Sequence, residues 1–141
     1  MCLVINFKKH SSNIKTGKYR PRISIFPIVV YKVLYKKEYG ISWYTPQRDF
    51  PIEFHNNKCV MESDMVSSYA SDSYVDLVFQ GIHAFTESGI AIHASRFWET
   101  NGFIKNYHVF KAIIPPFTKY FIGINDDIVS EKLIIKNKII K

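Results

Sequence analysis

The sequence predicts an α+β fold, with a single domain that has a mostly antiparallel sheet and one main helix at about residues 88–100. Three observations support this fold class. The chain has 141 residues, a length typical of one domain with one core. Short runs rich in β-branched and aromatic residues recur between clusters of Gly, Pro and Asn. One segment has the apolar period of an amphipathic helix.

The N-terminal part is expected to hold a short strand, a basic arm and a longer β-rich run. Residues 3–7 are apolar and β-prone, whereas residues 8–22 are polar and basic, which indicates a loop or arm. Residues 23–35 are rich in Ile, Val and Tyr. Because Pro27 cannot donate to a β-ladder, this run is either an edge strand or two strands that meet at a bend. We therefore divide the chain into a basic N-terminal strand and arm, residues 1–22, and a single α+β domain, residues 23–141.

The middle of the chain is expected to be less regular. Residues 46–58 contain two prolines and two asparagines and indicate irregular structure, and residues 63–76, rich in Ser and Asp, indicate a loop. Short strands are expected on both sides of Gly81. After the helix, strands are expected at residues 106–114, 119–124 and 128–140, the last as one strand or a kinked pair.

The helix is predicted from its apolar spacing and its stop signal. Apolar side chains recur at positions i, i+4, i+7 and i+8, and Asn101-Gly102 is a typical helix end. We expect the helix to bury one apolar face against the sheet, formed by Ile90, Ala94, Phe97 and Trp98.

The charge of the chain is unevenly distributed. The net charge is +7, with a local charge of +8 in residues 1–60, −5 in residues 61–104 and +4 in residues 105–141. The first 37 residues hold nine basic side chains and no acidic one, a pattern that attracts polyanions. We therefore expect RNA or a ribonucleoprotein as partner. The candidate contact residues are the nine bases and two aromatic residues suited to base stacking: Lys8, Lys9, Lys15, Lys18, Arg20, Arg22, Lys32, Lys36, Lys37, Tyr19 and Trp43.

Several classes of chemistry find no support in the sequence. Two cysteines are too few for a disulfide scaffold, and the histidines lack metal-ligand spacing, so we expect no metal. We expect no cofactor and no catalytic residues either, because no phosphate-binding glycine loop or nucleophile motif is found. No apolar run approaches a membrane span. These features favour a non-catalytic cytoplasmic protein with reduced cysteines.

Four short segments carry a resemblance to a known group of proteins. They are YKVL at residues 31–34, GIHAF at 81–85, AIIPPFTKYFIG at 112–123 and IVSEKL at 128–133. In this order they resemble small, largely uncharacterised proteins of bacterial phages and mobile elements, over roughly residues 31–135. The chain departs from that pattern at Pro116, where a Lys-Gly type turn is more usual. The resemblance implies an accessory protein of a mobile element and provides no catalytic residues.

Two functional hypotheses follow from the sequence. The first is a non-catalytic phage or mobile-element protein that binds a host nucleoprotein, as an anti-CRISPR-like inhibitor of an RNA-guided immune nuclease in the host cytoplasm. Either the basic arm or the acidic segment at residues 62–76 could make the contact. The alternative is a small enzyme or nucleotide-ligand-binding protein, similar to a diverged ADP-ribosyltransferase, with a cleft near Gly81–Phe85. In the first hypothesis His83 is structural, and in the second it is functional. A structural virion protein is a third possibility.

Overall fold

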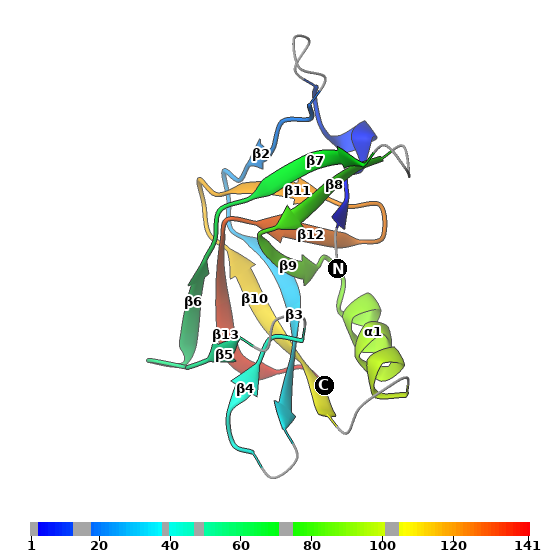
Figure 1. The fold of residues 1–141 in the computed structure, drawn as a ribbon. Coiled ribbons are helices and arrows are strands. Elements are labelled where there is room, and N and C mark those ends of the chain that lie inside the picture. Colours follow the sequence, from blue (N-terminus) through cyan, green and yellow to red (C-terminus); the bar gives the residue numbers. More distant parts are fainter. Residues whose placement is uncertain (1–2, 13–17, 38–39, 47–49, 71–74, 101–104) are drawn as a thin grey trace.

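A computed structural model describes residues 3–12, 18–37, 40–46, 50–70, 75–100 and 105–141. The expected mostly antiparallel sheet and single main helix are confirmed, although strands outweigh helix more than a balanced α+β fold implies. Figure 1 shows the strands wrapped around a common interior, with the helix α1 against their outer side. Among the described residues, every strand pairing is antiparallel.

The larger sheet has ten strands, eight of which follow the order β2-β11-β12-β9-β3-β10-β13-β6. The strands β4 and β5 pair beside β3, off this path. The bounds are β2 Arg22–Ile23, β3 Ile28–Lys37, β4 Trp43–Tyr44, β5 Pro51–Ile52, β6 Lys58–Glu62, β9 Ile82–Phe85, β10 Lys105–Ile114, β11 Lys119–Ile122, β12 Asp127–Ser130 and β13 Lys132–Ile139.

Four joints close part of this sheet into a ring. The strand β3 pairs with β9 on one side and β10 on the other, β9 pairs with β12, and β10 pairs with β13. Only Glu131 separates β12 from β13, so these two strands form one kinked strand. Its first half pairs with β9 and its second half with β10, which closes the ring. The main hydrophobic core lies inside the ring and is formed by inward residues of all its strands, among them Val30, Leu34, Ile82, Ala84, Phe110, Ile128 and Leu133.

A three-stranded sheet, in the order β1-β8-β7, holds the N-terminus. Its strands are β1 Leu3–Val4, β7 Val66–Ala70 and β8 Val75–Gln80. Leu3 and Ile5 are buried in a second core with Phe121 and Val129, so the N-terminal strand packs against the larger sheet. A 3-10 helix, η1 Phe7–Lys9, follows.

The middle of the chain is more regular than the sequence suggested. Strands β5 and β6 lie in or next to residues 46–58, and β7 lies within residues 63–76, which we expected to be a loop. In β6, Cys59 and Met61 alternate with more exposed residues and pack on the main core. This expectation was wrong for two reasons. The strand β6 is held by pairing with the distant β13, which local composition does not record. The strand β7 pairs with the next strand, β8, although its Ser-rich composition is typical of a loop.

The helix α1, Ser88–Thr100, has the predicted bounds but a different buried face. Ala91 and Ser95 are buried, and Trp98 packs against β10 and β9, whereas Phe97 is 59% exposed. The prediction that Phe97 is buried was wrong. Ala91 and Ser95 have small side chains that fit in the close packing between the helix and the sheet. The buried face of the helix is therefore determined by side-chain size as well as by hydrophobicity.

Candidate functional site

The candidate site is formed around Lys32, which lies inside the ring. Successive side chains of a strand point to opposite faces, and on β3 the residues Val30 and Leu34 both belong to the main core. Lys32, midway between them, therefore points to the same interior and is only 8% exposed. Its register partner on β10 is Phe110, which is fully buried. The sequence prediction had placed Lys32 with the surface cations, but the structure places it in the interior.

A gap beside β3 accommodates the Lys32 ammonium. The strand pairs with β9 at Tyr31, opposite Phe85, and with β4 from Tyr35 onwards, opposite Tyr44. Between these two joints, the Lys32 ammonium donates a hydrogen bond to the carbonyl oxygen of His83 on β9. The Lys32 side chain thus bonds to β9 beyond the single register pair that joins β3 and β9. Figure 1 shows β9 and β4 beside different parts of β3.

Burial lowers the pKa of Lys32 from its usual 10.5 to about 8. In the described part of the chain, no carboxylate forms an ion pair with this ammonium. An ammonium has three N–H donors, and the contacts found among those residues use one of them, on His83. Lys32 is therefore a buried cation with remaining hydrogen-bonding capacity and no negative partner, an arrangement that is costly unless a ligand compensates it.

A cavity of about 420 Å³ adjoins this ammonium. Both sides of the gap contribute to its wall: His83 and Phe85 come from β9, and Thr45 and Phe50 from the segment around β4. Trp98 of α1 and Met61 of β6 also line it. Its volume suits a small molecule, and its wall combines apolar side chains with polar ones, among them Thr45, Glu62 and Asp127.

Two other titratable groups on the cavity wall are held in their neutral forms more strongly than usual. Burial raises the pKa of the Cys59 thiol, against the opposing effect of a backbone hydrogen bond at Glu53, and the charge of the Glu53 carboxylate adds a smaller rise. Burial also raises the pKa of Asp127, against the opposing effect of a hydrogen bond from the Asn125 N–H. The thiol of Cys59 is therefore a weak nucleophile at neutral pH.

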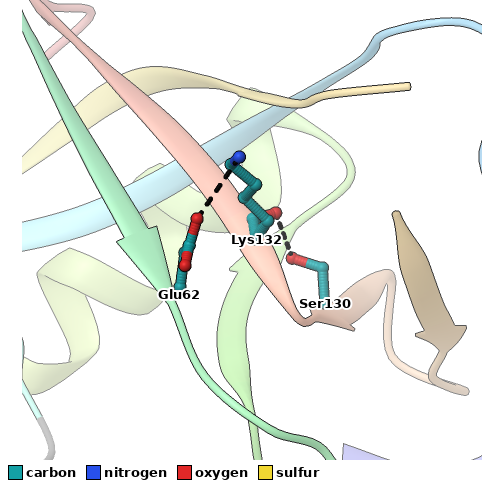
Figure 2. A network of polar contacts seen from close by, with 3 residues as sticks. All are labelled: Glu62, Ser130 and Lys132. Carbon is teal, nitrogen blue, oxygen red and sulfur yellow. Dashed lines mark hydrogen bonds and ion pairs between the residues drawn. The ribbon is translucent and has the colours of Figure 1, made fainter. Parts of the chain in front are cut away.

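A second hollow, of about 480 Å³, lies beside the cavity and shares Glu62 and Ser63 with it. Figure 2 shows Glu62 facing Lys132 across β6 and β13, near the kink where Ser130 donates to the carbonyl of Lys132. The Lys132 Nζ to Glu62 Oε1 distance is 3.3 Å, and both side chains are exposed. Such a pair contributes about 0–1 kcal/mol, so it marks the rim of the cavity more than it stabilises the fold.

The predicted surface cations fall in separate places. Near the N-terminus, Lys8, Lys9, Lys18, Arg20 and Arg22 are exposed, and Tyr19 is half-buried against the second core. At the far end of β3, the Lys36 ammonium lies 4.5 Å from the centre of the Trp43 ring. Trp43 packs edge-on against Phe110, so its ring is part of the core. Lys37 ends β3, and Lys15 lies outside the described residues.

His10 anchors the N-terminal arm to the sheet. Its Nδ1 lies 3.0 Å from the carbonyl oxygen of Arg20, and its Nε2 lies 2.9 Å from the backbone nitrogen of Ile122. Because a backbone N–H can only donate, Nε2 must accept, so the imidazole is neutral with its proton on Nδ1. Burial lowers the pKa of His10, consistent with this assignment.

His83, considered above as structural or functional, lies on β9 between two residues of the main core, Ile82 and Ala84. By strand alternation, its side chain points away from that core, so its carbonyl is the group that meets Lys32. Among the described residues, no three His, Cys, Asp or Glu side chains gather as metal ligands would.

Most of the cavity wall, including Thr45, Phe50, Met61 and Asp127, was not predicted from the sequence. These residues come from segments far apart in the chain and share no local motif. Lys32 is the one charged residue within the apolar run at residues 28–35, which is a hint of its burial. In the part of the chain that the structure describes, no helix is long and apolar enough to span a membrane.

Comparisons with known proteins identified no relative. No family model, curated protein or solved structure matches the chain.

Proposed function

We propose that this protein binds a small anionic molecule in the cavity beside β3 and that Lys32 holds its acid group. The observation that carries the proposal is the buried Lys32 ammonium, next to a cavity of about 420 Å³ and without a carboxylate partner in the described chain. This function corresponds to the alternative hypothesis of a ligand site near Gly81–Phe85.

The chemistry of the cavity favours one class of ligand. A carboxylate or phosphate would accept the remaining N–H donors of Lys32 and neutralise its charge. Phe50, Met61 and Trp98 offer apolar surface for the rest of the molecule. We therefore expect a small organic acid or a phosphate ester with an apolar body.

The proposal is tested by ligand-induced stabilisation. A panel of 2-oxo acids, fatty acids and nucleoside monophosphates is added to the purified protein, and the shift in unfolding temperature is measured. A ligand at 100 times its Kd stabilises the folded state by about 2.7 kcal/mol. Lys32→Met removes the charge at similar length and should abolish the shift, while Lys138→Met, at an exposed position of β13, should retain it. Equal shifts in the two variants would refute the proposal.

A second candidate function is supported by the N-terminal end of the molecule. Lys8, Lys9, Lys18, Arg20 and Arg22 are all exposed there, and His10 holds the arm in place against β11. An end rich in exposed cations suits attraction to RNA or a ribonucleoprotein. We propose this contact as the way in which the protein would act on an RNA-guided nuclease, the first functional hypothesis from the sequence.

Salt dependence tests the second candidate. Replacing Lys18, Arg20 and Arg22 by Ala removes up to three phosphate contacts, so the slope of log affinity against log salt for single-stranded RNA should flatten by about 2. Binding is titrated at several salt concentrations with the wild type and the triple variant. Identical slopes would show that these side chains make no phosphate contact.

A further inference from the structure

We propose that Lys32 reacts reversibly with the carbonyl group of an aldehyde or ketone ligand in the cavity and forms an imine. The inference rests on the proposed function, because it assigns a reactive group to the same anionic ligand. The ligand class is thereby narrowed to small oxo acids or aldehydes that bear an acid group.

The position of Lys32 supports this reaction. Its side chain points into the ring and lines the cavity, and its nitrogen donates a hydrogen bond to the His83 carbonyl. A neutral amine keeps two N–H groups and one lone pair. If one N–H remains on His83, the lone pair is directed away from that carbonyl. The hydrogen bond therefore orients the amine as a nucleophile instead of only anchoring it.

The protonation state of Lys32 also supports the reaction. Only the neutral amine attacks a carbonyl, and burial has already brought the pKa of Lys32 to about 8. At pH 8 about half of the Lys32 side chains are neutral, compared with roughly 0.3% of an ordinary exposed lysine, a difference of roughly 100-fold. Desolvation of a lysine in an apolar pocket is a known way to activate this nucleophile.

Lys32 is also favoured over the other nucleophile that lines the cavity. Cys59 is the other nucleophile on the wall, but burial raises the pKa of its thiol, so little thiolate is present. Two carboxyl groups, Glu62 and Asp127, line the same cavity. Together with His83, which also lines the cavity, they are able to carry protons during the reaction.

The reaction balances without any further reagent. The amine lone pair forms a C–N bond to the carbonyl carbon, while the electron pair of the C=O bond moves to oxygen. A proton passes from nitrogen to that oxygen, giving a carbinolamine. The C–O bond then breaks as a second proton makes the oxygen leave as water, and the nitrogen lone pair completes the C=N bond. The protonated imine retains the positive charge that pairs with the acid group of the ligand.

The test uses glyoxylate, an aldehyde that carries a carboxylate. The full chain is incubated with glyoxylate and sodium cyanoborohydride at pH 8, and the labelled lysines are located by peptide mass spectrometry. We expect Lys32 to be labelled roughly 10- to 100-fold faster than Lys138, with a rate that rises around pH 8. In urea-unfolded protein this preference should disappear.

Two results separate this inference from the proposed function. If glyoxylate shifts the unfolding temperature but the label is spread evenly over the lysines, the imine is refuted and the anion site stands. If glyoxylate and the rest of the panel cause no shift and Lys32 is not preferred, both ideas fail. Lys32→Arg provides a matched variant, since it retains a cation but cannot form an imine. Stabilisation by glyoxylate that this variant retains in full would show that charge alone accounts for binding.

Discussion

Replacing Lys32 by Met should make the protein more stable at neutral pH while it abolishes ligand binding. At pH 7 the wild-type Lys32 side chain is buried as a charged ammonium. The fall of its pKa from 10.5 to about 8 means that burying this charge costs about 3 kcal/mol of folding free energy. The variant removes this penalty. It also leaves the His83 carbonyl without its donor, which costs about 1–2 kcal/mol. A net gain of about 1–2 kcal/mol is therefore expected at pH 7.

The pH dependence gives this prediction its sign. Between pH 8 and pH 10.5 the unfolded chain binds a proton at Lys32 that the folded chain has released, so the Lys32 contribution to stability rises with pH. The wild type should gain about 3 kcal/mol relative to Lys32→Met over this window. Near pH 10.5 the variant should thus be the less stable of the two.

Urea unfolding of both proteins at pH 7, 8, 9 and 10 measures this difference, and comparing the two curves cancels the other titrating groups. Lys138→Met serves as the control for loss of an exposed lysine. Curves for wild type and Lys32→Met that stay parallel from pH 7 to pH 10 would refute the reasoning, because Lys32 would then titrate as an exposed lysine does. A residue that destabilises the fold and is needed for binding would be expected of a functional site.

Three further predictions concern the helix, a turn and the arm. Trp98→Ala should lower the free energy of unfolding by about 3 kcal/mol, because Trp98 packs on Phe85 and Tyr107 of the sheet. Phe97→Ala should change it by less than about 1 kcal/mol, because the Phe97 side chain is mostly exposed. Equal losses in urea unfolding would contradict this orientation of the helix. Gly81→Ala should lower the free energy of unfolding by roughly 2–4 kcal/mol. The φ of Gly81 is +141°, and a Cβ there would lie 2.4 Å from Val129 Cγ1. Gly89→Ala is the control, because a Cβ there would meet nothing within 4 Å and should cause no such loss of thermal stability. The free energy of unfolding should fall as the pH drops below 6.5. In the unfolded chain His10 takes up a proton there, whereas burial lowers the pKa of His10 in the folded chain. His10→Gln should reduce the slope of unfolding free energy against pH, and an unchanged slope would exclude His10 as its source.

The features best predicted from the sequence are those that depend on neighbouring residues in the chain. The bounds of α1 followed from its apolar spacing and its stop signal. The separation of β2 from β3 was one of the two alternatives that Pro27 left open, the other being an edge strand. The kink at Glu131 was among the expected alternatives for the last β-rich segment. In each case the responsible residues lie within a few positions of the feature.

Features that depend on distant segments could not be predicted in this way. Lys32 appeared as one of nine N-terminal bases, and its burial depends on β9, β10 and β13, which close the ring from 50 to 100 residues further along the chain. The strand β6 has exposed alternate positions at Lys58, Val60 and Glu62, and its extended form comes from pairing with the distant β13. The strand β7 is a different case, because its partner β8 is the next strand and its Ser-rich composition concealed it.

The ring also has one joint much weaker than the others. The β3–β10 joint has ten consecutive register pairs, from Ile28 opposite Ile114 to Lys37 opposite Lys105, whereas β3 and β9 share the single pair of Tyr31 and Phe85. Local openings follow the weakest joint, so backbone amides at the β3–β9 joint should exchange with solvent deuterium before those of the β3–β10 ladder. A ligand on Lys32 would bridge both sides of this seam. Its binding would then be visible as slower exchange in β9, which links occupancy of the cavity to the local dynamics of the sheet.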